Sequence, residues 1–271
     1  MTDSAPKLII FTDLDGTLFD SATYSYKPAL PALELLQRRQ IPIVFCSAKT
    51  SAEQEAHREE LGIGDPFIVE NGGAIFIPRG YFPFDFEYQK TEGDYSVIEL
   101  GMPYAEIGAV LQQIRDRIGI EFKGFGDMSP QEVAGETGLD LKAARHAKKR
   151  EYSETVKLEG TPQEIGEVLN TIRESGLNYA HGGRYYGVMG ANNKGKAATI
   201  LIKMFRRKLG EVRTVGLGDS DNDLPLLAVV DIPVLVQKPE GWWADMHLPG
   251  LRRVEGSGPT GWKQAIEELP D

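Results

Sequence analysis

The segment Leu8-Ile9-Ile10-Phe11-Thr12-Asp13-Leu14-Asp15-Gly16-Thr17 is the most informative part of this sequence. Its first five residues are apolar or β-branched and predict a buried strand, and Gly16 predicts the turn that follows. In an open parallel α/β sheet, ligands bind beyond the carboxyl ends of the strands. The side chains of Asp13 and Asp15 are therefore expected at such an edge, where they can meet around one small site.

Two carboxylates held close together repel each other and call for a cation. A site made of oxygen ligands favours Mg²⁺. The same Asp-x-Asp-Gly pattern also occurs in turns and in calcium loops. An EF-hand loop would need Asp or Asn two residues after Asp15, where this chain has Thr17. The motif on its own leaves a catalytic site and a simple turn open.

Three further segments place polar residues after a strand or at a helix start. They are Ser47-Ala48-Lys49-Thr50, Gly218-Asp219 with Asp223, and Lys194. Hydroxyl and backbone N–H groups at a helix start can hold a phosphate, and the two carboxylates can join a metal site. Each segment also has a simpler explanation, because Ser, Thr and Asp are favoured helix caps and a helix-opening lysine is typical of a solvated surface.

The order of the predicted elements indicates an α/β fold with an insertion. Strands and helices alternate at both ends of the chain, which predicts one parallel sheet built from both. The predicted strands are 8–12, 41–46, 67–69, 212–217 and 232–236, and the predicted helices are 28–39, 50–62, 195–209 and 222–230. Between them the chain is more irregular, with predicted helices over 103–118 and 161–176 and a half-exposed strand over 152–158. We predict a core from residues 1–83 and 187–271, with an inserted α+β cap over 84–186.

The composition narrows the class of protein. The chain has 271 residues, a formal net charge of −10 and 41% hydrophobic residues, enough for a sizeable core in one or two domains. The acidic balance without a Lys/Arg cluster argues against a nucleic-acid partner. The single cysteine, Cys46, excludes a disulfide within the chain and favours a cytoplasmic location. No segment approaches the ~20 apolar residues of a membrane span, so a soluble protein without a membrane partner is expected.

Taken together, the four motifs resemble those of the haloacid dehalogenase superfamily of aspartyl phosphatases. The superfamily pattern is Asp-x-Asp-x-Thr, then Ser or Thr, then Lys, then Gly-Asp-x-x-x-Asp. It is matched here by Asp13 to Thr17, Ser47, Lys194, and Gly218-Asp219 with Asp223. The insertion between the second and third motifs matches the larger cap type of the superfamily. The resemblance implies a Rossmann-like parallel-sheet core with an inserted α+β cap.

The resemblance also implies a role for each motif. Asp13 would attack phosphorus and form an aspartyl phosphate, and Asp15 would act first as the acid and then as the base. The implied ligands of Mg²⁺ are the Asp13 carboxylate, the Asp15 backbone carbonyl and Asp219. Ser47 and Lys194 would bind the phosphoryl oxygens, and Asp223 would support the metal ligands or position Lys194.

A finer resemblance is carried by segments of both core and cap. Residues 47–50, Glu70-Asn71-Gly72-Gly73, 149–154, His181-Gly182-Gly183-Arg184-Tyr185-Tyr186 and 258–262 are similar to mannosyl-3-phosphoglycerate phosphatases. That family releases mannosylglycerate, a compatible solute. The substrate-binding residues that the resemblance implies are Lys49, Thr50, Glu70, Asn71, Gly72, Arg150, His181 and Arg184.

The chemistry of such a substrate is consistent with these residues. It carries a carboxylate besides the phosphate, and Arg150 and Arg184 can clamp a carboxylate with paired hydrogen bonds. His181 and its neighbouring glycines would lie beside the sugar. Simpler alternatives are an exposed ion pair of Arg150 with Glu151 or Glu154, and an ordinary strand position for His181.

Other functions stay open at this point. Glucosyl-3-phosphoglycerate, sucrose phosphate and other sugar phosphates are alternative substrates. A phosphomutase on the same fold would pass the phosphoryl group to a second hydroxyl. A phospho-receiver or binding module is the non-enzymatic alternative, and Asp15 argues against it because a receiver has no leaving group to protonate.

Overall fold

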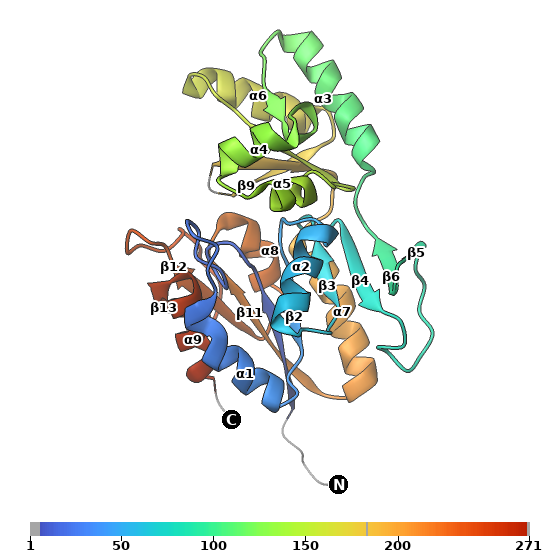
Figure 1. The fold of residues 1–271 in the computed structure, drawn as a ribbon, viewed down its shortest axis with the longest axis vertical. Helices are drawn as coiled ribbons and strands as arrows, with labels where there is room; N and C mark the ends of the chain where they lie inside the picture. Colours follow the sequence, from blue (N-terminus) through green and yellow to red (C-terminus); the bar gives the residue numbers. More distant parts are fainter. Residues whose placement is uncertain (1–5, 183, 270–271) are drawn as a thin grey trace.

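The computed structural model describes residues 6–182 and 184–269, and Gly183 of the quoted cap segment lies outside them. The core contains a five-stranded parallel sheet in the order β13-β12-β11-β1-β2. Its strands are β1 (Lys7–Thr12), β2 (Ile43–Phe45), β11 (Val212–Gly218), β12 (Ile232–Gln237) and β13 (Arg252–Ser257). A second body of helices and strands sits above one end of this sheet (Figure 1). The predicted α/β core, built from both ends of the chain, is confirmed.

Helices cover both faces of the parallel sheet, which explains why its strands read as continuous apolar runs. Ile10 packs in the cluster of α1 (Leu30–Arg38) and α9 (Gly258–Glu267). Its neighbours Ile9 and Phe11 point to the opposite face, where they pack against α7 (Lys194–Leu209). Successive residues of β1 are thus buried on opposite faces of the sheet. Because β1 and β11 are parallel, the motifs that follow them emerge at the same edge of the sheet.

The two halves of the core meet at β1 and β11. These strands pair in parallel, with Phe11 opposite Gly216 and Thr12 opposite Leu217. On the other side of β1, Thr12 pairs with Phe45 of β2. The ends of the three strands therefore lie side by side, although they are far apart in the sequence.

The third predicted strand is not among the five strands of the parallel sheet, although it runs parallel beside β2, so this prediction holds only in part. β3 (Phe67–Val69) begins an antiparallel sheet in the order β3-β4-β6-β5, with β4 (Ala74–Pro78), β5 (Lys90–Glu92) and β6 (Tyr95–Glu99). β3 lies beside β2, and a parallel bridge joins Ile68 to Cys46, the residue that directly follows β2. Residues 70–72 all have positive φ, so the chain reverses after β3 and pairs it with β4.

The cap contains the antiparallel sheet β7-β8-β10-β9. Its strands are β7 (Lys123–Gly124), β8 (Ser153–Lys157), β9 (Asn178–Gly182) and β10 (Tyr185–Met189), and its helices are α3 (Tyr104–Ile118), α4 (Pro130–Thr137), α5 (Leu141–Ala147) and α6 (Pro162–Glu174). α3 and α6 pack on one face of the sheet, while α4 and α5 lie toward the core (Figure 1). Because both faces are covered, four of the five residues of β8 are buried rather than alternately exposed.

The predicted cap limits, residues 84 and 186, stay a prediction. Because β5 and β6 pair with β4 rather than with the cap sheet, we propose that the cap begins after them, near Met102. The cap contacts the core through α5 against α2 (Ser51–Leu61), and through β9 against the 3-10 turn Asp221–Asp223. Both contacts lie beside the edge where the motifs emerge.

Of two helices predicted in the core, one agrees with the structure and the other is shorter than predicted. The helix predicted over 50–62 is α2, which begins with a capping box of Thr50 and Glu53 and ends at Gly62. The helix predicted over 222–230 is shorter, because Asp221–Asp223 form a 3-10 turn and α8 covers only Leu224–Leu227. Within 6–182 and 184–269, we find no helix whose length and apolar character would suit a membrane span.

Candidate active site

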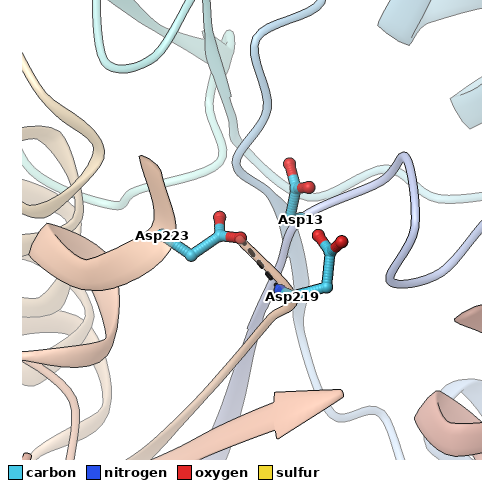
Figure 2. Close-up of side chains that lie close together, drawn as sticks. All are labelled: Asp13, Asp219 and Asp223. Carbon is cyan, nitrogen blue, oxygen red and sulfur yellow. Dashed lines mark hydrogen bonds between the residues drawn. The ribbon is translucent and has the colours of Figure 1, made fainter. Parts of the chain in front are cut away.

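Three aspartates meet at the edge of the parallel sheet. Asp13 directly follows β1, Asp219 directly follows β11, and Asp223 ends the 3-10 turn that comes next. Each offers a carboxylate oxygen, and these oxygens lie within 4.8 Å of one another (Figure 2). All three residues are buried, with 5%, 3% and 0% of their surfaces exposed. Such a set of oxygen donors fits a divalent cation.

Lys194 lies in the same cluster. Its Nζ is 2.6 Å from Oδ1 of Asp13 and 2.7 Å from Oδ1 of Asp223, and the residue is fully buried. It is the first residue of α7, which Asn193 caps by accepting a hydrogen bond from the N–H of Lys196. The sequence left a solvated surface lysine open at this position. The buried ammonium instead balances part of the charge of the three carboxylates.

Asp223 is held by donors on both of its oxygens. Its Oδ2 accepts hydrogen bonds from the backbone N–H groups of Asp219 at 3.0 Å and Ser220 at 3.1 Å, while Oδ1 faces Lys194. These contacts favour a positioning role for Asp223. They leave Asp13 and Asp219 as the two carboxylates better placed to reach an ion.

The first and fourth motifs fit against each other at Gly16 and Thr17. Gly16 has a φ of +81°, and a Cβ added there would lie 2.5 Å from Oδ2 of Asp219. Thr17 donates a hydrogen bond of 3.2 Å from its hydroxyl to Oδ1 of the same carboxylate. A residue with a side chain at position 16 would both strain the turn and displace Asp219.

Two residues that the sequence analysis gave no role support this cluster. Lys238, directly after β12, contacts the Asp219 carboxylate and lies 2.6 Å from the hydroxyl of Ser220. Trp262 is fully buried and donates from its indole N–H to the Thr12 hydroxyl at 2.9 Å, next to Asp13. Lys238 could have been found by applying the strand-end rule to β12, whereas Trp262 lies in the segment 258–262 that carries the finer resemblance, which gave it no role.

Asp15 lies apart from the buried cluster. Its carboxylate is 44% exposed and sits 2.9 Å from Nζ of Lys49. Both residues line a cavity of about 150 Å³ between core and cap. The predicted residues Asn71 and Arg150 line the same cavity, together with Asn222 and cap residues of α4, α5 and the cap sheet. The structure thus brings together four of the predicted catalytic and substrate residues around one space.

Three of the predicted substrate residues, Thr50, Glu70 and Gly72, do not line this cavity. Glu70 is enclosed by the segment that enters β8, where it accepts from the N–H groups of Glu151 at 2.9 Å and Tyr152 at 3.1 Å and from the Ser153 hydroxyl at 2.6 Å. Burial raises the pKa of this carboxyl, and Arg150 opposes the rise.

The Thr50 hydroxyl caps α2 and lies 3.0 Å from the backbone carbonyl of His146 in the cap. Gly72 has a φ of +87°, and a Cβ there would lie 2.2 Å from the carbonyl oxygen of Asn193. Thr50 and Glu70 therefore tie core to cap, and Gly72 lets the turn after β3 pack against the start of α7. These contacts favour structural roles, and a substrate role for the three stays a prediction.

The remaining predicted residues are divided among three places. Ser47 is buried beside the end of β1 and its hydroxyl accepts from the Lys49 N–H at 3.4 Å. His181 lies on β9, stacks on the Tyr186 ring at 4.5 Å and lines a separate cavity of about 440 Å³ together with Lys194. Arg184 is exposed and donates a long hydrogen bond, 3.4 Å, to the carbonyl of Thr137.

The charge state of Asp13 predicts a pH-dependent stability. Burial has the largest influence and raises the pKa of this carboxyl to about 7, against the lowering effect of Lys194, while Asp223 and Asp219 raise it further. Because this folded-state pKa lies above the unfolded value of 3.8, the folded state holds the proton more tightly. Its stabilising contribution is complete below about pH 4 and is lost as the pH rises to about 7.

We expect wild-type protein without divalent ions to lose about 3 kcal/mol of unfolding free energy between pH 4.5 and pH 8, relative to Asp13→Asn. Urea unfolding in EDTA at pH 4.5 and pH 8 measures the difference, and the variant subtracts the contribution of the groups that do not interact with Asp13. At pH 8, a divalent cation should raise the unfolding free energy of the wild type more than that of the variant. Parallel pH profiles for the two proteins would contradict the expectation.

Comparisons with known proteins agree with this geometry. A family model described as haloacid dehalogenase-like hydrolase matches residues 10–238. The chain therefore belongs to the haloacid dehalogenase-like hydrolases. It is 48% identical over 264 residues, 97% of each chain, to the glucosyl-3-phosphoglycerate/mannosyl-3-phosphoglycerate phosphatase of Methanococcoides burtonii. It is 40% identical to the mannosyl-3-phosphoglycerate phosphatase of Pyrococcus furiosus, over 84% of this chain and 90% of that one. Within the hydrolases, it belongs to the mannosyl-3-phosphoglycerate phosphatase family.

A solved structure shows the same fold at much lower identity. A Thermoplasma acidophilum protein superposes with a TM-score of 0.70 at 17% identity, covering 97% of both chains. The core and cap arrangement is therefore shared well beyond the range of close sequence similarity.

Proposed function

We propose that this protein is a Mg²⁺-dependent phosphatase that hydrolyses mannosyl-3-phosphoglycerate to mannosylglycerate and phosphate. The observation that carries the proposal is the Asp13 carboxylate, which lies at the strand edge against Lys194 and beside Asp219. The names of the two relatives support the substrate class, and the Methanococcoides burtonii name also supports the glucosyl compound as an alternative. The partner is then a small phosphorylated glycoside.

The residues present fit a bound Mg²⁺. Three buried carboxylate oxygens lie within 4.8 Å of one another, and burial raises the pKa of both Asp13 and Asp219, so a cation would relieve their crowding. Asp13, Asp219 and the backbone carbonyl of Asp15 would hold the ion, with Asp223 beside them. When bound, it supplies positive charge that offsets the repulsion between a carboxylate and a phosphate.

Asp13 and Asp15 would divide the bond-making and proton-transfer steps. Asp13 attacks phosphorus, and the phosphorus–oxygen bond to the glycerate oxygen breaks as Asp15 donates a proton to that oxygen. Asp15 then takes a proton from a water molecule, which attacks the aspartyl phosphate and releases inorganic phosphate. Its partly exposed carboxylate, which lines the cavity, is placed to exchange protons with both substrate and water.

Lys194 and Ser47 would bind the phosphoryl oxygens while Asp223 holds the ammonium in place. The buried ammonium of Lys194 faces the Asp13 oxygen at 2.6 Å and is already oriented before substrate arrives. Donors that are fixed in advance stabilise the charge that develops on the transferring phosphoryl group.

Arg150 and Lys49 are the cations best placed for the substrate carboxylate. The Arg150 side chain is 8% exposed and lines the cavity. Its Nη1 donates to the Ser153 hydroxyl at 2.8 Å, yet its Nε is buried without a partner among the described residues. A buried donor without a partner is costly, and a carboxylate in the cavity would satisfy it.

Arg184 supports a separate prediction about the cap. Because it is exposed on the cap and only weakly bound to Thr137, we expect Arg184→Ala to raise KM for the glycosylated substrate about 10-fold. Turnover of a minimal aryl phosphate should stay largely intact. Arg117→Ala is the matched control, because Arg117 is an exposed cap arginine paired with Glu174. Equal losses on both substrates would argue against substrate binding by Arg184.

A panel of substrates tests the proposed function. Phosphate release would be measured from mannosyl-3-phosphoglycerate, glucosyl-3-phosphoglycerate, sucrose 6-phosphate and 3-phosphoglycerate, with Mg²⁺ and with EDTA. The proposal expects the highest kcat/KM for the mannosyl compound and no release in EDTA. A requirement for a bisphosphate would indicate a phosphomutase, and stable phosphorylation of Asp13 without release would indicate a receiver.

A further inference from the structure

Tyr24 lies in the loop between β1 and α1, which reaches the cap-facing side of the core (Figure 1). Its φ of +56° falls in the left-handed region that residues other than glycine rarely adopt. Asp20 maintains this conformation: its carboxylate accepts from the N–H of Thr23 at 2.8 Å and from the Thr23 hydroxyl at 2.7 Å. The N–H of Tyr24 in turn donates to the carbonyl of Asp20 at 2.9 Å. Backbone strain of this kind persists only where the surroundings impose it.

The imposed conformation makes Tyr24 part of the wall of the cavity that contains Asp15. The half-buried ring lies beside Lys49, whose Nζ is 5.2 Å from the ring centroid. The cap contributes Phe125, Leu139 and Tyr185 to the same cavity, and the rings of Phe125 and Tyr185 are 5.5 Å apart. The cavity therefore combines charged and amide groups next to the reacting centre with aromatic surface from both core and cap.

A phosphoryl group and a glycerate carboxylate use only the charged part of this lining. A hexose, in contrast, presents hydroxyl groups around its edge and C–H groups on one face, and it suits a cavity with both kinds of surface. An aromatic ring packs against such an apolar face, whereas it has no use in binding phosphate.

We propose that Tyr24 is a specificity-determining residue whose ring packs against the glycosyl group of the substrate. This inference rests on the proposed function, because it assigns a residue to the sugar of that substrate. Tyr24 takes no part in bond making. A merely structural reading is that the ring only holds Lys49 in place, and that reading predicts equal losses for substrates with and without a sugar.

The test compares mannosyl-3-phosphoglycerate with 3-phosphoglycerate, which lacks only the sugar. Tyr24→Asn removes the ring but keeps a residue type that tolerates positive φ, and Tyr24→Phe keeps the ring. We expect Tyr24→Asn to lower the ratio of the two kcat/KM values about 10- to 100-fold, mainly through KM for the glycosylated substrate. Tyr24→Phe should retain the ratio. If Tyr24→Asn does not fold, Tyr24→Gly serves the same comparison because glycine is relaxed at positive φ.

Binding of mannosylglycerate, the product without phosphate, gives a readout that is independent of turnover. Calorimetric titration should show binding to the wild type that weakens about 10-fold or more in Tyr24→Asn. Equal loss on both phosphorylated substrates, or unchanged product binding, would overturn the role of Tyr24 while leaving the proposed function intact. Failure of the wild type to release phosphate from either the mannosyl or the glucosyl compound would overturn the proposed function and this inference together.

Discussion

Asp13→Asn is expected to lower kcat for phosphate release by on the order of 10⁴-fold or more. The amide lacks the negative charge of the attacking oxygen, so no aspartyl phosphate can form. The loss should appear in kcat rather than KM, because Lys194, Ser47 and the cap residues still bind the substrate. The substitution should not unfold the protein, since it removes a charge from a buried group of three carboxylates.

Intact-mass measurement on rapidly quenched samples gives a second readout. The wild type should show a phosphorylated species during turnover, and Asp13→Asn should show none. Asp116→Asn is the matched control, because Asp116 is exposed on α3 and accepts a hydrogen bond from its helix neighbour Gln112. If Asp13→Asn kept turnover within 10-fold of wild type, the nucleophile would have to be another residue.

Lys194→Met is expected to affect both stability and catalysis. Removing the ammonium leaves the carboxylates of Asp13 and Asp223 buried without their cation, which should lower the unfolding free energy by about 3–5 kcal/mol in EDTA. It also removes a fixed donor to the phosphoryl group, which should lower kcat by about 10²- to 10³-fold. Saturating Mg²⁺ should restore part of the stability but not the activity.

Urea unfolding with and without Mg²⁺, together with kcat under saturating substrate, measures both effects. Lys196→Met is the control on the same helix, because Lys196 is exposed while Lys194 is fully buried. Should the two variants prove equally stable in EDTA, the charge balance that we assign to Lys194 would be wrong.

Much of the core and of the buried cluster could be predicted because the relevant signals are local. Apolar runs that end in Asp13, Ser47 and Asp219 identify strands and their carboxyl ends, and parallel strands bring those ends to one edge. The capping box of Thr50 and the stop at Gly62 are also read from neighbouring residues. The family resemblance added Lys194, for which spacing alone was ambiguous.

What the site residues contact could not be predicted in the same way, because many of these contacts join segments that are far apart in the sequence. Nothing near Glu70 in the sequence indicates that its carboxylate faces the segment before β8, and nothing near Trp262 indicates that it holds the residue before Asp13. The case of β3 differs, because its partner β4 is set by the adjacent turn of three residues with positive φ, two of which are not glycine. A strand pattern shows which side chains are buried but does not name what they contact.

The sequence by itself determined that Asp13 and Asp219 meet at one sheet edge, because both directly follow strands of one parallel sheet; Lys194 was added by the family resemblance. Only the tertiary structure decided which predicted residues line the cavity and which join core to cap. It also placed Tyr24 beside Lys49 in that cavity. The physical reason is that the direction of a side chain in a loop depends on backbone angles and on packing against segments more than a hundred residues away.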